Sequence, residues 1–62
     1  MKIKGLFALI TKDQDDEVTV HYIQAKRKPT IRQAVIIAFG KDDVNMVIDS
    51  FSLEVEQVET CN

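Results

Sequence analysis

The sequence has no tryptophan, one cysteine and no long apolar run among its 62 residues. Its longest apolar stretches, "GLFALI" and "AVIIAFG", are far shorter than the roughly 18 residues of a membrane span. The first residues also lack the layout of a signal peptide. Because Cys61 stands alone, no disulfide can close within the chain, and we interpret it as an incidental exposed thiol. We therefore expect a soluble cytoplasmic protein that does not enter a membrane.

Residues that could carry catalysis are equally scarce. His21 is the only histidine, and neither it nor Cys61 belongs to a recognisable nucleophile–base motif. The acidic stretch "DQDDE" at 13–17 lacks the glycine and the glutamate of a calcium loop, because Val18 and Gln24 occupy those positions. We predict a protein that is not an enzyme and binds no cofactor or metal.

What is present is ordinary globular composition, with 45% hydrophobic and 29% charged residues. A chain of this length forms one domain, 1–62, with a thin core. Residues 2–12 are dense in β-formers and apolar on both faces, as in a central strand. The acidic stretch suits a hairpin loop of four or five residues. A second strand is predicted at 17–26, with Val18, Val20 and Tyr22 on one face and Thr19, His21 and Ile23 on the other.

A capping box marks the start of the main helix. Thr30 and Gln33 have the required spacing, and Pro29 ends the second strand just before them. A stripe of apolar residues then follows at helical spacing, and Gly40 supplies a left-handed position that ends the helix. The stripe consists of Ile31, Ala34, Val35 and Ala38. Further apolar residues, Ile36, Ile37 and Phe39, widen it, which indicates a second buried side or a surface offered to another molecule.

The remaining segment allows two interpretations before it becomes a strand. Residues 42–49 have helical spacing but many β-branched residues, so a short helical turn and an early strand both remain open. From Ser50 the pattern has period two, with Phe51, Leu53 and Val55 inward. This strand ends near Glu59, with Val58 out of phase at a bulge.

These elements predict an α+β fold of β–β–α–β order. The second strand runs antiparallel to the first, and the last strand returns beside the first, giving a three-stranded antiparallel sheet of order 2-1-3. The helix packs on one face, which we assign to the side of Phe7 and Val20. That choice leaves the other face uncovered, and we expect a homodimer to cover it. The residues on the uncovered face are Leu6, Ala8, Ile10 and Ile23.

Charges of opposite sign are segregated along the chain, although the net charge is only −2. The basic residues Lys26, Arg27, Lys28 and Arg32 gather at the junction between the second strand and the helix. We predict partner binding there, with an acidic protein surface, nucleic acid and a merely solvated junction as the alternatives. Glu54 and Glu56 on the last strand form the secondary candidate surface.

The chain also resembles small phage-encoded inhibitors of host machinery, namely the inhibitor of bacterial RNA polymerase and anti-CRISPR proteins. The resemblance covers the β–β–α–β order, the acidic hairpin loop, the "T-x-x-x-A" phrase at 30–34 followed by Ala38, and the final strand "SLEVEQVE". It implies a regulator or inhibitor, from a phage or another mobile element, that binds a host protein or complex. No binding residue carries over. The alternative function is a small nucleic-acid-binding regulator that uses the basic junction.

Overall fold

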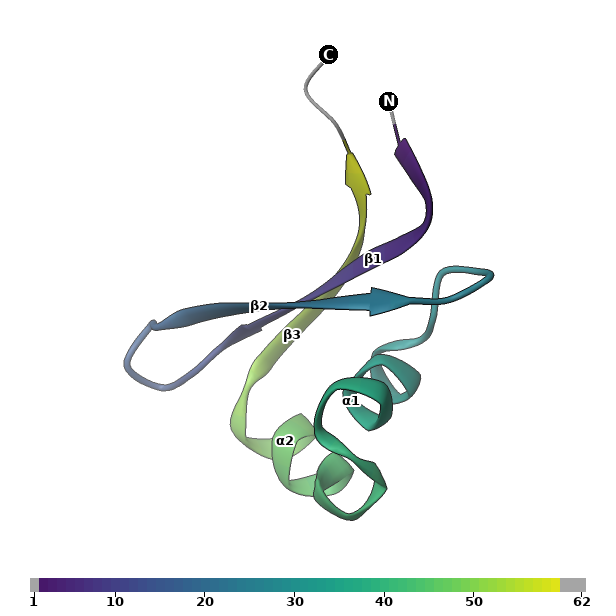
Figure 1. The fold of residues 1–62 in the computed structure, drawn as a ribbon. Coiled ribbons are helices and arrows are strands. Elements are labelled where there is room, and N and C mark those ends of the chain that lie inside the picture. Colours follow the sequence, from purple (N-terminus) through teal and green to yellow (C-terminus); the bar gives the residue numbers. More distant parts are fainter. Residues whose placement is uncertain (1, 60–62) are drawn as a thin grey trace.

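The computed structural model describes residues 2–59 and confirms the predicted α+β fold (Figure 1). Cys61 lies outside the described residues. The elements in chain order are β1 (Lys2–Lys12), β2 (Val18–Gln24), α1 (Ile31–Phe39), the 3₁₀ turn η1 (Lys41–Asp43), α2 (Val44–Ser50) and β3 (Ser52–Glu59). The three strands form one antiparallel sheet of order β2-β1-β3. Residues 42–49, for which the sequence allowed either a short helical turn or an early strand, are helical and belong to η1 and α2. No helix in the described residues is long and apolar enough to cross a membrane.

The main helix α1 begins at the predicted capping box. The Thr30 hydroxyl accepts a hydrogen bond from the Gln33 backbone N–H at 3.1 Å. In return, the Gln33 side-chain oxygen accepts one from the Thr30 backbone N–H at 3.0 Å. Gly40 follows the last helical residue with φ 105° and ψ 157°. The positive φ confirms the predicted left-handed position, although ψ lies outside the left-handed helical range, and this combination of angles is open essentially to glycine alone.

The acidic hairpin loop at 13–17 is organised by one carboxylate. The Asp13 side chain accepts hydrogen bonds from the backbone N–H groups of Asp15 and Glu17, both at 2.9 Å. The Asp13 N–H donates to the Glu17 carbonyl at 3.1 Å, and Asp16 adopts a positive φ of 62° that aspartate tolerates. The five-residue loop between β1 and β2 agrees with the predicted length, and the Asp13 carboxylate serves the turn.

The loop also decides which side of β2 faces the helices, and here our assignment of Val20 and Ile23 is wrong. The register pairs Phe7 with Ile23 and Leu9 with His21. Directly opposite residues share a face, so Ile23 lies with Phe7 beneath the helices, and Val20 lies on the other face. His21 is half-buried on the helix side, where its ring packs edge-on against Phe39 at 4.7 Å between centroids.

The core lies between the sheet and the two helices, which occupy the same side of the sheet (Figure 1). Its buried members are Phe7, Leu9, Ile23, Ala34, Val35, Val44, Val47 and Val55. Of these, Leu9, Ile23 and Val35 are the largest side chains that are fully buried. The helices thus cover one face of the sheet, and we call the opposite face the open face.

On β3, Leu53 and Val55 lie toward the helices as predicted, but the irregularity expected at Val58 belongs to β1. The pairing passes from Lys2 with Glu59 to Phe7 with Gln57, so the extra residues lie in β1. Gly5 stands in this stretch with φ 76°. A positive φ of this size suits glycine, which explains why one of only two glycines in the chain is found within a strand.

Candidate protein-binding surfaces

The predicted basic cluster lies in the loop between β2 and α1, at residues 25–30. Lys26, Arg27 and Lys28 are all exposed. The loop is held at both ends, because the Ala25 N–H donates to the Gly5 carbonyl at 3.0 Å and Pro29 is buried ahead of the helix cap. The three basic side chains are therefore displayed from an anchored loop.

Arg27 and Lys28 share an open depression with apolar residues of α1. The depression measures about 500 Å³, and we call it the basic groove. Its lining residues are Ala25, Arg27, Lys28, Pro29, Gln33, Ile36 and Ile37. Ile37 is 55% exposed and Ile36 is 36% exposed, so apolar surface stands open to solvent directly beside two cations. The widened apolar stripe of the helix had indicated either a second buried side or an exposed apolar surface, and Ile36 and Ile37 form an exposed surface.

The other two predicted basic residues lie elsewhere. The Arg32 guanidinium donates to the Asn45 side-chain oxygen at 3.3 Å, a contact between α1 and α2. Lys26 lines a different depression together with Lys4, Gly5 and Leu6. Arg27 and Lys28 thus line the basic groove together, whereas Lys26, although next to Arg27 in the loop, and Arg32 do not line it. Within residues 2–59 the one ion pair is Lys12 with Asp16 at 3.3 Å, at the exposed hairpin.

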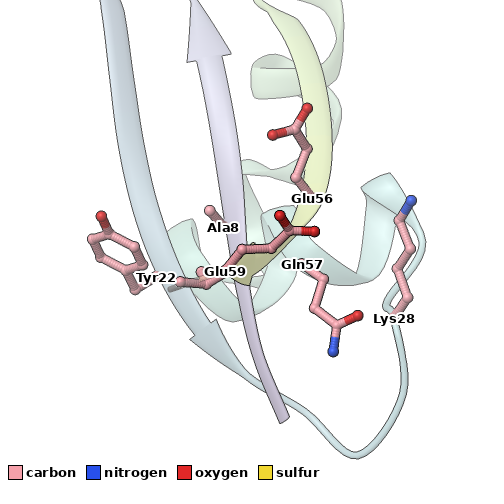
Figure 2. A pocket seen from close by; sticks show the side chains of 7 residues that line it. Ala8, Tyr22, Lys28, Glu56, Gln57 and Glu59 are labelled. Carbon is pink, nitrogen blue, oxygen red and sulfur yellow. The ribbon is translucent and has the colours of Figure 1, made fainter. Parts of the chain in front are cut away.

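The secondary candidates, Glu54 and Glu56, are exposed on the open face of β3. Ala8 on the central strand lies directly between Tyr22 and Glu56, and because alanine is small, a hollow of about 570 Å³ forms above it. Figure 2 shows Tyr22 and Glu56 on the two strands that flank Ala8, and Lys28 on the loop at the opposite side from Tyr22. Glu59 also lines this hollow, whereas Glu54 lies outside it. Lys28 of the basic loop therefore lines the same hollow as Glu56 and Glu59 of the acidic strand.

The most exposed apolar side chains of the sheet belong to β2. Tyr22 is 70% exposed, Val18 56% and Val20 44%. Sequence reasoning placed Val20 in the core and so missed this surface. The length of the hairpin loop could have indicated the correct face of β2. Because the loop has an odd number of residues, odd-numbered residues of β2 lie opposite odd-numbered residues of β1, which face the helices.

No protein-family model, curated protein or solved structure matches the chain. Within the described range, no group of three or more histidine, cysteine, aspartate or glutamate residues is placed to hold a metal ion.

Proposed function

We propose that this chain is a non-enzymatic protein-binding domain whose basic groove binds an acidic, partly apolar surface of another protein. The observation that carries the proposal is the position of Arg27 and Lys28 beside the exposed Ile36 and Ile37. Cations attract an acidic partner and fix its orientation, while apolar contacts supply affinity. A groove with both kinds of group fits an amphipathic segment that carries carboxylates along one side.

The surroundings of the groove favour protein over nucleic acid. No aromatic side chain lines it, although single-stranded nucleic acid is usually held by stacking on aromatic rings. In addition, Lys28 lines not only the basic groove but also the hollow above Ala8. Glu56 and Glu59 line that hollow too, and their carboxylates would repel a phosphate backbone. The net charge of −2 works in the same direction.

A small protein that acts by binding alone regulates its target by covering a surface of it. This is the role implied by the resemblance to phage inhibitors, so we propose a regulator or inhibitor of a host protein complex. We also propose that the chain acts as a homodimer, because Val18, Val20 and Tyr22 leave apolar surface on β2 exposed.

The basic groove is tested by reversing its two charges. We expect an Arg27→Glu, Lys28→Glu variant to keep its melting temperature within a few degrees, because exposed charges contribute little to stability. Its binding should weaken at least about tenfold, because each attraction becomes a repulsion. The measurement is capture of partners from host lysate, treated with nuclease, on immobilised protein, followed by titration of the recovered partner. A Lys4→Glu, Lys41→Glu variant has the same change in net charge and should bind as wild type.

A second substitution separates protein binding from nucleic-acid binding. Ile37→Ser removes exposed apolar surface and leaves every charge in place, so we expect weaker binding of a protein partner by roughly 1 kcal/mol. Retention on DNA or RNA, if the basic loop bound phosphates, would be unchanged by Ile37→Ser and lost in the charge-reversed variant. Wild-type binding of the captured partner by the charge-reversed variant would refute the proposal.

A further inference from the structure

We infer that the free edge of β2 is the homodimer interface, where the β2 strands of two copies pair antiparallel into one six-stranded sheet. The inference rests on the proposed homodimer and adds the surface and register through which it forms. It follows from three features of β2: the direction of its backbone groups, its lack of charge and its self-complementary order of side chains.

The backbone groups of β2 alternate between β1 and the free edge. The hydrogen bonds from Ala25 N–H to the Gly5 carbonyl and from Asp13 N–H to the Glu17 carbonyl bracket the strand. Both bonds use odd-numbered residues, and in an antiparallel ladder only every second residue bonds to a given neighbour. The odd-numbered residues of β2 therefore bond to β1. The even-numbered ones, Val18, Val20, Tyr22 and Gln24, turn their N–H and C=O groups toward the free edge.

Nothing in β2 protects this edge from pairing. Exposed edges are usually blunted by lysine, proline, a bulge or an inward-pointing charge. The sequence of β2, "VTVHYIQ", contains no lysine, proline or formal charge, and its pairing with β1 is regular throughout. The opposite edge strand, β3, carries Glu54, Glu56 and Glu59. Two β3 edges would bring like charges together, whereas two β2 edges would not.

One register satisfies every outward backbone group. With a two-fold axis passing at His21, Val20 of one copy lies opposite Tyr22 of the second copy, and Val18 opposite Gln24. All four outward residues of each strand then bond across the interface, whereas a register centred on Val20 or on Tyr22 engages only three. A two-fold axis perpendicular to the sheet keeps the helices of both copies on one face. It also places the acidic β3 strands at the two far edges, at maximal separation.

This register also favours a second copy of the chain as the occupant of the edge. It places a β-branched residue against an aromatic one twice, on the exposed side of both strands, which is a favourable cross-strand pair. Val20 and Tyr22 are partly exposed in the single chain, so the same pairing covers the apolar surface that the fold leaves open. A second copy supplies both members of each of these pairs by symmetry.

Cross-linking between copies tests the register directly. Single Val20→Cys and Tyr22→Cys chains are prepared with Cys61→Ser and mixed under oxidising conditions. Opposed residues in a hydrogen-bonded pair have Cα atoms about 5.5 Å apart, within the range a disulfide spans. We expect a disulfide between one Val20→Cys chain and one Tyr22→Cys chain. Dominant self-linking of either chain alone would overturn the register, and absence of any cross-link would overturn the interface.

Sedimentation equilibrium of the uncross-linked protein tests the edge independently. We expect wild type to be dimeric at micromolar concentration, Val20→Lys to raise the dimer dissociation constant at least about tenfold, and Ser52→Lys on the opposite edge to leave it unchanged. A monomer at all concentrations, or polymers larger than a dimer from β2 pairing with β3, would overturn the inference. Partner capture through the basic groove is measured separately, so either proposal can fail without the other.

Discussion

At the scale of single residues, the start of α1 depends on Thr30. Its hydroxyl and the Gln33 side chain satisfy two backbone N–H groups at 3.1 and 3.0 Å. No acidic residue in the first turn of α1 offers a substitute. This local motif was predictable from sequence because both partners lie within one turn.

We therefore expect Thr30→Ala to lower the free energy of unfolding by about 0.5–2 kcal/mol, a large share for so small a domain. Urea denaturation followed by circular dichroism measures the change. Thr30→Ser retains the hydroxyl and should stay close to wild type. An unchanged midpoint for Thr30→Ala would show that the cap contributes nothing.

Gly5 is the other residue whose identity the backbone dictates. At φ 76° an alanine would place its Cβ at ordinary contact distance, 3.4 Å, from the Ala25 carbonyl oxygen. The cost thus comes from the backbone conformation, and we expect Gly5→Ala to destabilise by roughly 1–2 kcal/mol. Gly5→Asn should cost less, because asparagine enters the left-handed region more readily. Equal stability of the alanine variant and wild type in thermal melts would contradict this explanation.

At the scale of elements, local patterns predicted the helix and the strands, but not how the strands present their faces. Hydrophobicity favours Val18, Val20 and Tyr22 as the inward side of β2. The structure instead buries Ile23 and packs His21 on Phe39. The register set by the hairpin loop overrides the composition of a single strand, because a shift by one residue would turn every side chain of β2 to the other face and expose the buried Ile23. The gathering of Lys26, Arg27 and Lys28 at the strand–helix junction follows from their adjacency in the sequence, whereas the contact of Arg32 with Asn45 depends on α2 and could not be read from the sequence.

The assignment of the two faces of β2 can be tested by a pair of neighbouring truncations. We expect Ile23→Ala to cost about 2–5 kcal/mol, because Ile23 is almost completely buried. Tyr22→Ala should stay within roughly 0.5 kcal/mol of wild type when measured at a concentration where the protein is monomeric. The reverse order of the two effects in denaturant titrations would restore the assignment that hydrophobicity favours.

At the scale of the whole molecule, the two proposed associations differ in their dependence on charge. The basic groove combines Arg27 and Lys28 with apolar surface, whereas the β2 edge has no formal charge. Raising sodium chloride from about 0.1 M to about 1 M shortens the Debye length from about 10 Å to about 3 Å, which screens exposed charges from one another.

We therefore expect the affinity for the captured partner to fall at least about tenfold over this range, because its attraction to the groove is electrostatic. The dimer dissociation constant should change far less, because backbone hydrogen bonds and apolar contacts between uncharged strands are not weakened by screening. Both quantities are measured on one preparation, by titration of the partner and by sedimentation. A dimer that dissociates with salt would place charged groups at the self-association surface, and partner binding that is indifferent to salt would remove the cations of the groove from recognition.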